Sequence, residues 1–186
     1  MSTLTTQTLT GTYVPDTTHS RIGFVARHAM VTKVRGHFSD YSGSGYFDSE
    51  APENSTIELT IQAESIDTGN ADRDGHLRSN DFFDMDNHKT IEFRSTDVAR
   101  VDEDVYRVTG DLTVRGTTRT IAFDLAYTGA AVDPFGNTRI GLEGSVTVNR
   151  KDFGLNWNAA LDTGGVLVSE KVTLEFDVSA IKADDA

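Results

Sequence analysis

Residues 70–93 read NADRDGHLRSNDFFDMDNHKTIEF, and they form a densely charged, helix-like segment in a chain that otherwise alternates like β-strands. Polar side chains crowd the first half of this segment, and the apolar residues Leu77 and Phe82 lie among and after them. On either side, residues 55–66 and 90–98 alternate between apolar and polar side chains, which predicts strands. The pattern therefore favours a short helical segment that forms a wall or lid on a β-structure.

The rest of the chain alternates in the same way. In residues 20–28, for example, Ile22, Phe24 and His28 share one face of a predicted strand. Gly43–Gly45 predicts a break in the alternation. Strands with one apolar and one polar face, and a single helical segment, predict an antiparallel all-β fold. About eight such strands can close into a barrel that holds one small ligand. Comparable alternation covers residues 32–38, 55–66, 89–99, 106–114, 121–127, 140–148 and 171–179.

Composition limits the functions that the chain can have. Its 186 residues carry a net charge of −12, which disfavours binding to nucleic acid. The chain has no cysteine, so disulfides, thiolate catalysis and cysteine-bound metals are excluded. The N-terminal residues lack the basic and apolar pattern of a signal peptide, and we expect a cytoplasmic protein. We expect one barrel domain over residues 12–181, with a disordered tail at 1–11 and a second tail at 182–186.

Oxygen-bearing residues at the start of the helical segment raise the question of a metal site. Asn70, Asp72, Asp74 and Gly75 are spaced like the beginning of a calcium-binding loop. Asn stands in place of the usual first Asp, however, and Asp81 in place of the final bidentate Glu. Acids in a first helical turn also complement the helix dipole. We therefore expect neither a metal nor another cofactor.

Motifs for catalysis are weak. The chain has no Gly-x-Ser-x-Gly elbow and no Gly-x-Gly-x-x-Gly fingerprint, so we expect no catalytic residues. His28 is interpreted as a core or rim histidine, or as a polar contact inside a cavity. An enzyme acting on a lipid or small molecule stays open as an alternative, with His28, Asp74 and His76 as its candidate residues.

Several motifs together resemble those of the YceI-like family. The resemblance covers about residues 12–181, and His88-Lys89 departs from it where the family commonly has a proline. The matching stretches are IDTGN at 66–70, RDGHL at 73–77, DFFD at 81–84, GDLTVRG at 110–116 and RKDFG at 150–154, together with Phe24, His28 and residues 34–38.

This resemblance implies an eight-stranded antiparallel, lipocalin-like barrel with one short helical segment. It also implies an apolar tunnel that holds a polyprenyl phosphate or an isoprenoid quinone, often in a homodimer, without a general enzymatic activity. We expect Arg73 and Asp74 to tie the helical segment to the barrel. A stress-linked interaction scaffold is a further alternative. The residues expected to contact the ligand are Phe24, His28, Ala63, His76, Leu77, Phe82, Phe83, Phe93, Leu112, Phe123, Leu125, Val146, Trp157 and Phe176.

Overall fold

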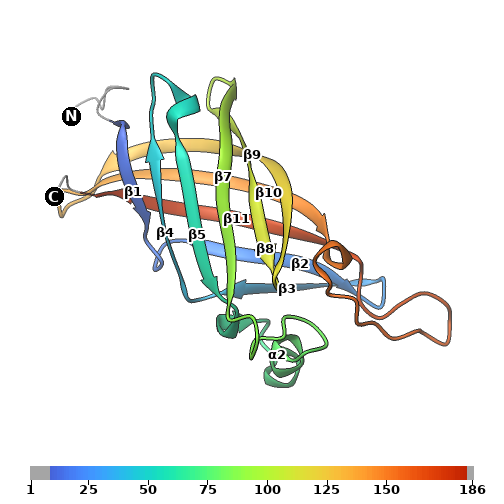
Figure 1. Cartoon of the computed structure of the whole chain (residues 1–186). Coiled ribbons are helices and arrows are strands. Elements are labelled where there is room, and N and C mark those ends of the chain that lie inside the picture. The colour runs from blue at the N-terminus through green and yellow to red at the C-terminus, as the bar shows by residue number, and fades with distance from the viewer. Residues whose placement is uncertain (1–8, 184–186) are drawn as a thin grey trace.

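The computed structural model describes residues 9–183, and its strands wrap around one interior (Figure 1). Every strand pairing in it is antiparallel, as the alternating sequence predicts. The strands are β1 (Gly11–Pro15), β2 (Arg21–His28), β3 (Thr32–Phe38), β4 (Tyr41–Phe47), β5 (Thr56–Gln62), β6 (Ile66–Asp67), β7 (Thr90–Asp102), β8 (Val105–Val114), β9 (Thr117–Val132), β10 (Thr138–Asn149) and β11 (Lys171–Lys182).

Eight of these strands form a closed ring. The ring runs β1-β4-β5-β7-β8-β9-β10-β11, and the pairing of β1 with β11 closes it. The other three strands, β2, β3 and β6, each continue a strand of the ring beyond a bend. For example, β1 and β2 follow one another along β11, with the pairings Val14↔Ile181 and Ile22↔Phe176. In the same way β3 leads into β4, and β5 continues into β6. The predicted eight-stranded antiparallel barrel is thus confirmed.

Beyond the closed ring, the pairing has a gap in the described residues. At the end where β2 and β3 extend, β6 pairs with β3 but lies at the edge of the sheet on its other side. No ladder joins β6 to β7 in the described residues, and the chain leaves the sheet between these two strands. Residues 68–89, including the helix, occupy this place at the end of the barrel (Figure 1).

The helix α2 (Ala71–Arg78) is much shorter than the charged segment, residues 70–93, in which a helix was predicted. The Asn70 side chain caps its start by accepting a hydrogen bond from the Arg73 amide at 3.0 Å. Ser79 ends it, since its hydroxyl donates to the His76 carbonyl at 2.6 Å. Turns follow as far as Lys89. No helix in residues 9–183 is long and apolar enough to span a membrane.

In residues 9–183, three short 3-10 helices lie between strands: η1 (Pro52–Asn54), η2 (Ala63–Ser65) and η3 (Arg150–Phe153). The predicted break at Gly43–Gly45 is wrong, because these residues lie inside β4. A Cβ atom on Gly43 would collide with the Glu58 carbonyl oxygen of β5, so glycine here permits close strand packing.

The ends of the domain differ slightly from the expected boundaries. Leu9 is buried, and its carbonyl accepts a hydrogen bond from the Tyr13 hydroxyl at 2.7 Å. The strand β1 begins at Gly11 and β11 ends at Lys182, each one residue outside the expected domain. The rest of the expected tails, residues 1–8 and 184–186, lies outside the described part of the chain.

Two ion pairs of Arg139 connect the segment after β1 with the segment after β9. Arg139 of β10 donates to Asp16, after β1, at 2.6 Å and to Asp133, after β9, at 2.8 Å. The hydrogen bond from Thr18, followed by the bonds from Arg139 and His19, holds the pKa of Asp16 well below its ordinary value. The bond from Arg139 does the same for the pKa of Asp133.

These lowered pKa values predict a loss of stability in acid. Both carboxylates favour the folded state above the unfolded Asp pKa of about 3.9, and this contribution disappears as the pH falls from there through their folded pKa values. Thermal melting between pH 7 and pH 2 is the measurement. Arg139→Met should melt below the wild type at neutral pH, and the two curves should converge in acid. A difference independent of pH would contradict the prediction.

Candidate functional site

The interior of the barrel is not completely filled by side chains. It encloses a cavity of about 340 Å³, within the range of about 300–1,000 Å³ found for small-molecule sites. Phe123, Leu174 and Phe176 belong to the inner faces of their strands, yet each is only half-buried, because it borders empty space. Inner faces of this kind indicate a binding cavity rather than a solid core.

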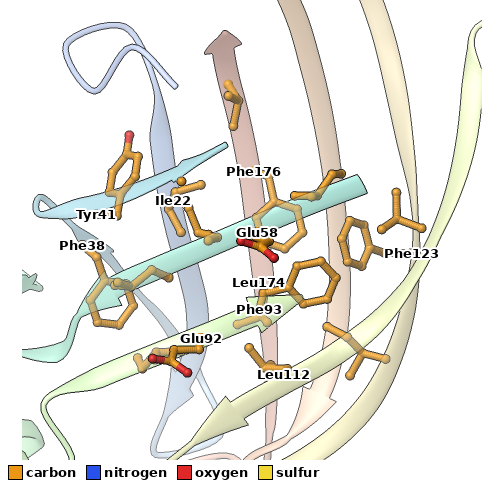
Figure 2. A pocket seen from close by; sticks show the side chains of 18 of the residues that line it. Ile22, Phe38, Tyr41, Glu58, Glu92, Phe93, Leu112, Phe123, Leu174 and Phe176 are labelled. Atoms are coloured by element: carbon orange, nitrogen blue, oxygen red, sulfur yellow. The ribbon is translucent and has the colours of Figure 1, made fainter. Parts of the chain in front are cut away.

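Aromatic rings and aliphatic side chains make the wall. Phe93 of β7, Phe123 of β9 and Phe176 of β11 lie together in the middle of the cavity (Figure 2). Their ring centroids are 5.6 Å apart for Phe93–Phe123 and 5.1 Å apart for Phe123–Phe176. Centroid distances of this size are favourable for aromatic pairs. The wall therefore offers a dry, polarisable surface to a hydrocarbon.

Few polar side chains border the cavity. Glu58 on β5 and Glu92 on β7 do so from exposed positions (Figure 2). Ser44 and Thr56 are exposed as well, and the Ser55 hydroxyl accepts a bond from the Asp48 amide at 3.0 Å. Among the described residues, the charged side chain that both lines the cavity and is buried is Arg150, with 5% of its surface exposed.

Phe82 closes the end of the cavity beneath α2. Its ring lines the cavity on one side, and His76 and Trp157 pack against it at centroid distances of 5.1 and 5.4 Å. Arg115, at the tip between β8 and β9, donates to the Phe82 carbonyl at 2.7 Å. His76 also bonds to Asp81 at 2.8 Å. We call Phe82, His76 and Trp157 the aromatic cap.

The other end of the cavity is rich in phenol groups. Tyr13 of β1 and Tyr127 of β9 line it, close to where Ile140 of β10 pairs with Ala180 of β11. Burial and the nearby Tyr127 raise the pKa of Tyr13 to about 12. Burial, followed by Asp104 and Tyr106, raises the pKa of Tyr127. Both phenols are therefore neutral at physiological pH.

Most of the residues expected to contact a ligand border the cavity. Ala63, by contrast, is in η2 and is 1% exposed, packed away from the cavity. Val146 is half-buried and is not part of the cavity wall. His76 and Trp157 lie behind Phe82, in the aromatic cap. The expected residues that do line the cavity are Phe24, Leu77, Phe82, Phe83, Phe93, Leu112, Phe123, Leu125 and Phe176.

His28 lies at the last position of β2, on the face predicted from the alternation. That strand end extends beyond the cavity, however, and Ala26 is the last residue of β2 that lines it. His28 is exposed and forms an isolated bridge with Val168. The alternation places His28 on the inner face of β2, but it cannot show that the cavity ends at Ala26.

Arg73 and Asp74 connect α2 to the chain after β6. The buried Asp74 carboxylate accepts hydrogen bonds from the Thr68 amide at 2.9 Å and from the Thr68 hydroxyl at 2.5 Å. Arg73 bonds to the same residue, with Nε 2.6 Å from the Thr68 hydroxyl oxygen and an Nη atom 2.7 Å from the Thr68 carbonyl. These contacts fit the structural role expected for both residues.

We predict that Asp74→Ala lowers the free energy of unfolding by about 1–3 kcal/mol, because the half-buried amide and hydroxyl donors of Thr68 would lose their acceptor. Asp72→Ala is the matched control, since Asp72 is exposed in the same helical turn and its loss should change stability by less than about 0.5 kcal/mol. Urea denaturation followed by circular dichroism measures both. Equal effects of the two substitutions would contradict a structural role for Asp74.

The calcium-like residues and the candidate catalytic residues have other partners. Asn70 caps α2 and Asp74 bonds to Thr68, so these oxygens are used within the protein. Within residues 9–183, no group of three or more acidic or histidine side chains could hold a metal ion. His28, Asp74 and His76 contact different partners, and none of the three lines the cavity.

Arg150 was missed as part of the site, although the sequence contains a signal for it. The apolar face of β10 includes Ile140, Leu142, Gly144, Val146 and Val148 at every second position. One further step of the same period places residue 150 inside the barrel. The pattern does not favour a charged residue at this position, because buried arginines are rare.

These features define a class of protein: a closed antiparallel barrel with an apolar cavity in its interior. The sequence pattern of the YceI-like domain matches residues 13–180, and the chain belongs to the YceI-like family.

Known relatives agree with this assignment. A UPF0312 protein of Pseudomonas aeruginosa is 36% identical over 164 residues, which is 88% of this chain and 82% of the relative. The crystal structure of the Campylobacter jejuni YceI protein superposes with a TM-score of 0.74 at 27% identity, covering 85% of this chain and 90% of that one. A polyisoprenoid-binding domain of Saccharophagus degradans has a TM-score of 0.70 at 16% identity, covering 94% and 99%.

Proposed function

We propose that this protein binds a long-chain isoprenoid lipid inside its barrel and acts as a carrier, store or sensor of that lipid. The observation that carries the proposal is the cavity, whose buried wall is apolar apart from Arg150 and a few hydroxyl groups. The name of the Saccharophagus degradans domain, which has the same fold, supports an isoprenoid as the ligand.

The physical reason is the transfer of hydrocarbon out of water. Each methylene group that enters an apolar site contributes about 0.8 kcal/mol, so several prenyl units together can give tight binding. Aromatic side chains along the wall can also contact the double bonds of a prenyl chain. The function needs no chemical step, and the candidate catalytic residues do not meet at the cavity.

Extraction with organic solvent followed by mass spectrometry tests the proposal. The purified protein should release a prenyl lipid in a fixed ratio to the polypeptide, and protein stripped of lipid should regain it from added isoprenoids. A protein that carries no lipid and takes up none would contradict the proposal. The outcome also distinguishes a lipid-binding barrel from an interaction scaffold, because a scaffold needs no ligand in its interior.

Two further expectations from the sequence belong to this proposal. The resemblance supports a homodimer, which sedimentation measurements test. Cell fractionation tests the cytoplasmic location.

A further inference from the structure

Arg150 occupies an unusual place for a cation. It begins η3, directly after β10, and its guanidinium group borders the cavity beside the Phe82 ring, with the carbon of the group 5.9 Å from the ring centroid. Only 5% of the residue is exposed. A buried charge is costly unless other groups compensate it.

The compensation that the protein supplies is incomplete. Arg150 donates to the carbonyl groups of Ser169 at 2.8 Å, Leu155 at 2.5 Å and Val168 at 3.3 Å. These are three bonds to neutral acceptors, whereas a guanidinium group carries five N–H donors. No carboxylate accepts a hydrogen bond from Arg150 in the described residues. Burial lowers its pKa, against the opposing effect of Glu170.

Glu170 does not complete the site, because it is engaged elsewhere. Its carboxylate is 2.7 Å from the Lys151 ammonium group, and both side chains are about half exposed. The hydrogen bond from Lys151 is also the main reason that the pKa of Glu170 is lowered. The buried guanidinium group therefore faces the cavity without a hydrogen-bonded anion.

The two ends of the cavity differ in charge. Arg150 follows Ile140, at the tyrosine end, by ten positions along β10, which corresponds to roughly 30 Å of strand. The tyrosine end presents neutral phenols and the Arg150 end presents a cation. A ligand with one charged end and a long apolar tail would therefore enter in one orientation.

We propose that Arg150 binds the anionic head group of the lipid, a phosphate ester, with the prenyl tail extending toward Tyr13 and Tyr127. This assignment rests on the proposed function and names the head group that the site selects. A phosphate would supply the missing counter-charge and accept the remaining N–H groups, and arginine forms such paired bonds with phosphate oxygens. The Phe82 ring would border the head group.

The chain contains its own reporter for this end of the cavity. Trp157 is the single tryptophan, and it packs against Phe82 on the side away from the cavity. Its fluorescence can follow a titration of lipid-free protein with geranylgeranyl phosphate and with geranylgeraniol, which have the same tail and differ in the head group. Inorganic phosphate and a quinone with a tail of four prenyl units are titrated in parallel.

We expect the wild type to bind the phosphate ester roughly tenfold or more tightly than the alcohol, as a charge-assisted pair in a dry site predicts. Arg150→Met should reduce this ratio to about one while leaving the affinity for the alcohol nearly unchanged. Arg115→Met is the matched control, since Arg115 contacts Phe82 but does not line the cavity, and it should keep the full ratio.

Equal affinities of the wild type for phosphate ester and alcohol would overturn the proposal, and this result needs no folded variant. An unchanged ratio in Arg150→Met, or a quinone preferred over the phosphate ester, would overturn it too. Binding of inorganic phosphate as tight as that of the ester would show a free-anion site instead. If all three lipids fail to bind, the proposed function itself is wrong; if they bind without preference, only the role of Arg150 is wrong.

Discussion

Leu174→Trp should leave the barrel folded and remove most of its bound lipid. Leu174 is on β11, lines the cavity and is half-buried. An indole group at this position would extend into a space of only about 340 Å³ and compete with the prenyl chain. We expect the melting temperature to change by a few degrees at most and the lipid affinity to fall about tenfold or more, which corresponds to about 1.4 kcal/mol.

Thr173→Trp provides the control for this substitution. Thr173 is the preceding residue of the same strand, its side chain is on the outer face, and its hydroxyl is 3.0 Å from that of Thr147. The Thr173→Trp variant should retain as much lipid as the wild type. Mass spectrometry of solvent extracts and thermal melting are measured on all three proteins. Full lipid occupancy in Leu174→Trp, or an unfolded variant at room temperature, would show that the interior is packed differently.

Ile66→Ala is expected to lower the free energy of unfolding by about 2–5 kcal/mol, the range for truncation of a fully buried aliphatic side chain. Ile66 is 1% exposed and lies in β6, within the main cluster of buried apolar residues. Removing its side chain would leave an enclosed void. Leu174→Ala should have a smaller effect, about 1 kcal/mol, because Leu174 already borders empty space and its loss only enlarges the cavity.

Urea denaturation of lipid-free protein compares the two alanine substitutions. Lipid must be absent, since a bound ligand would add its own stabilisation to the folded state. The order of the two effects is the informative result. If Leu174→Ala destabilises the protein as much as Ile66→Ala, the inner face of β11 behaves as a closed core.

Sequence alternation could predict most of the barrel, because a strand with one buried face must repeat every two residues. The alternation failed to predict a strand where glycines replace side chains so that two backbones can pack closely. Gly43 and Gly45 carry no side chain to alternate although they lie in β4, and Gly43 is needed where β5 approaches. The alternation also could not show that β1 and β2 follow one another along β11, because bends depend on long-range pairing.

The candidate site was harder to predict than the fold. The inner face of a strand is visible in the sequence, and Phe24, Phe93 and Phe176 were identified in this way. The depth of the cavity is not visible, which explains why His28 was included although it lies beyond the cavity. Arg150 was omitted although the alternation of β10 places residue 150 on the inner face, because a charged side chain is not expected there.

The gap in pairing between β6 and β7 has a consequence for the rate of lipid exchange. A ligand inside a ring of paired strands can leave sideways only by breaking backbone ladders, whereas at this gap residues 68–89, which belong to no ladder, block the way. The residence time of the lipid should therefore follow the opening of this segment. Amide hydrogen exchange in residues 71–88 and the dissociation rate of the lipid should then rise together in Asp74→Ala.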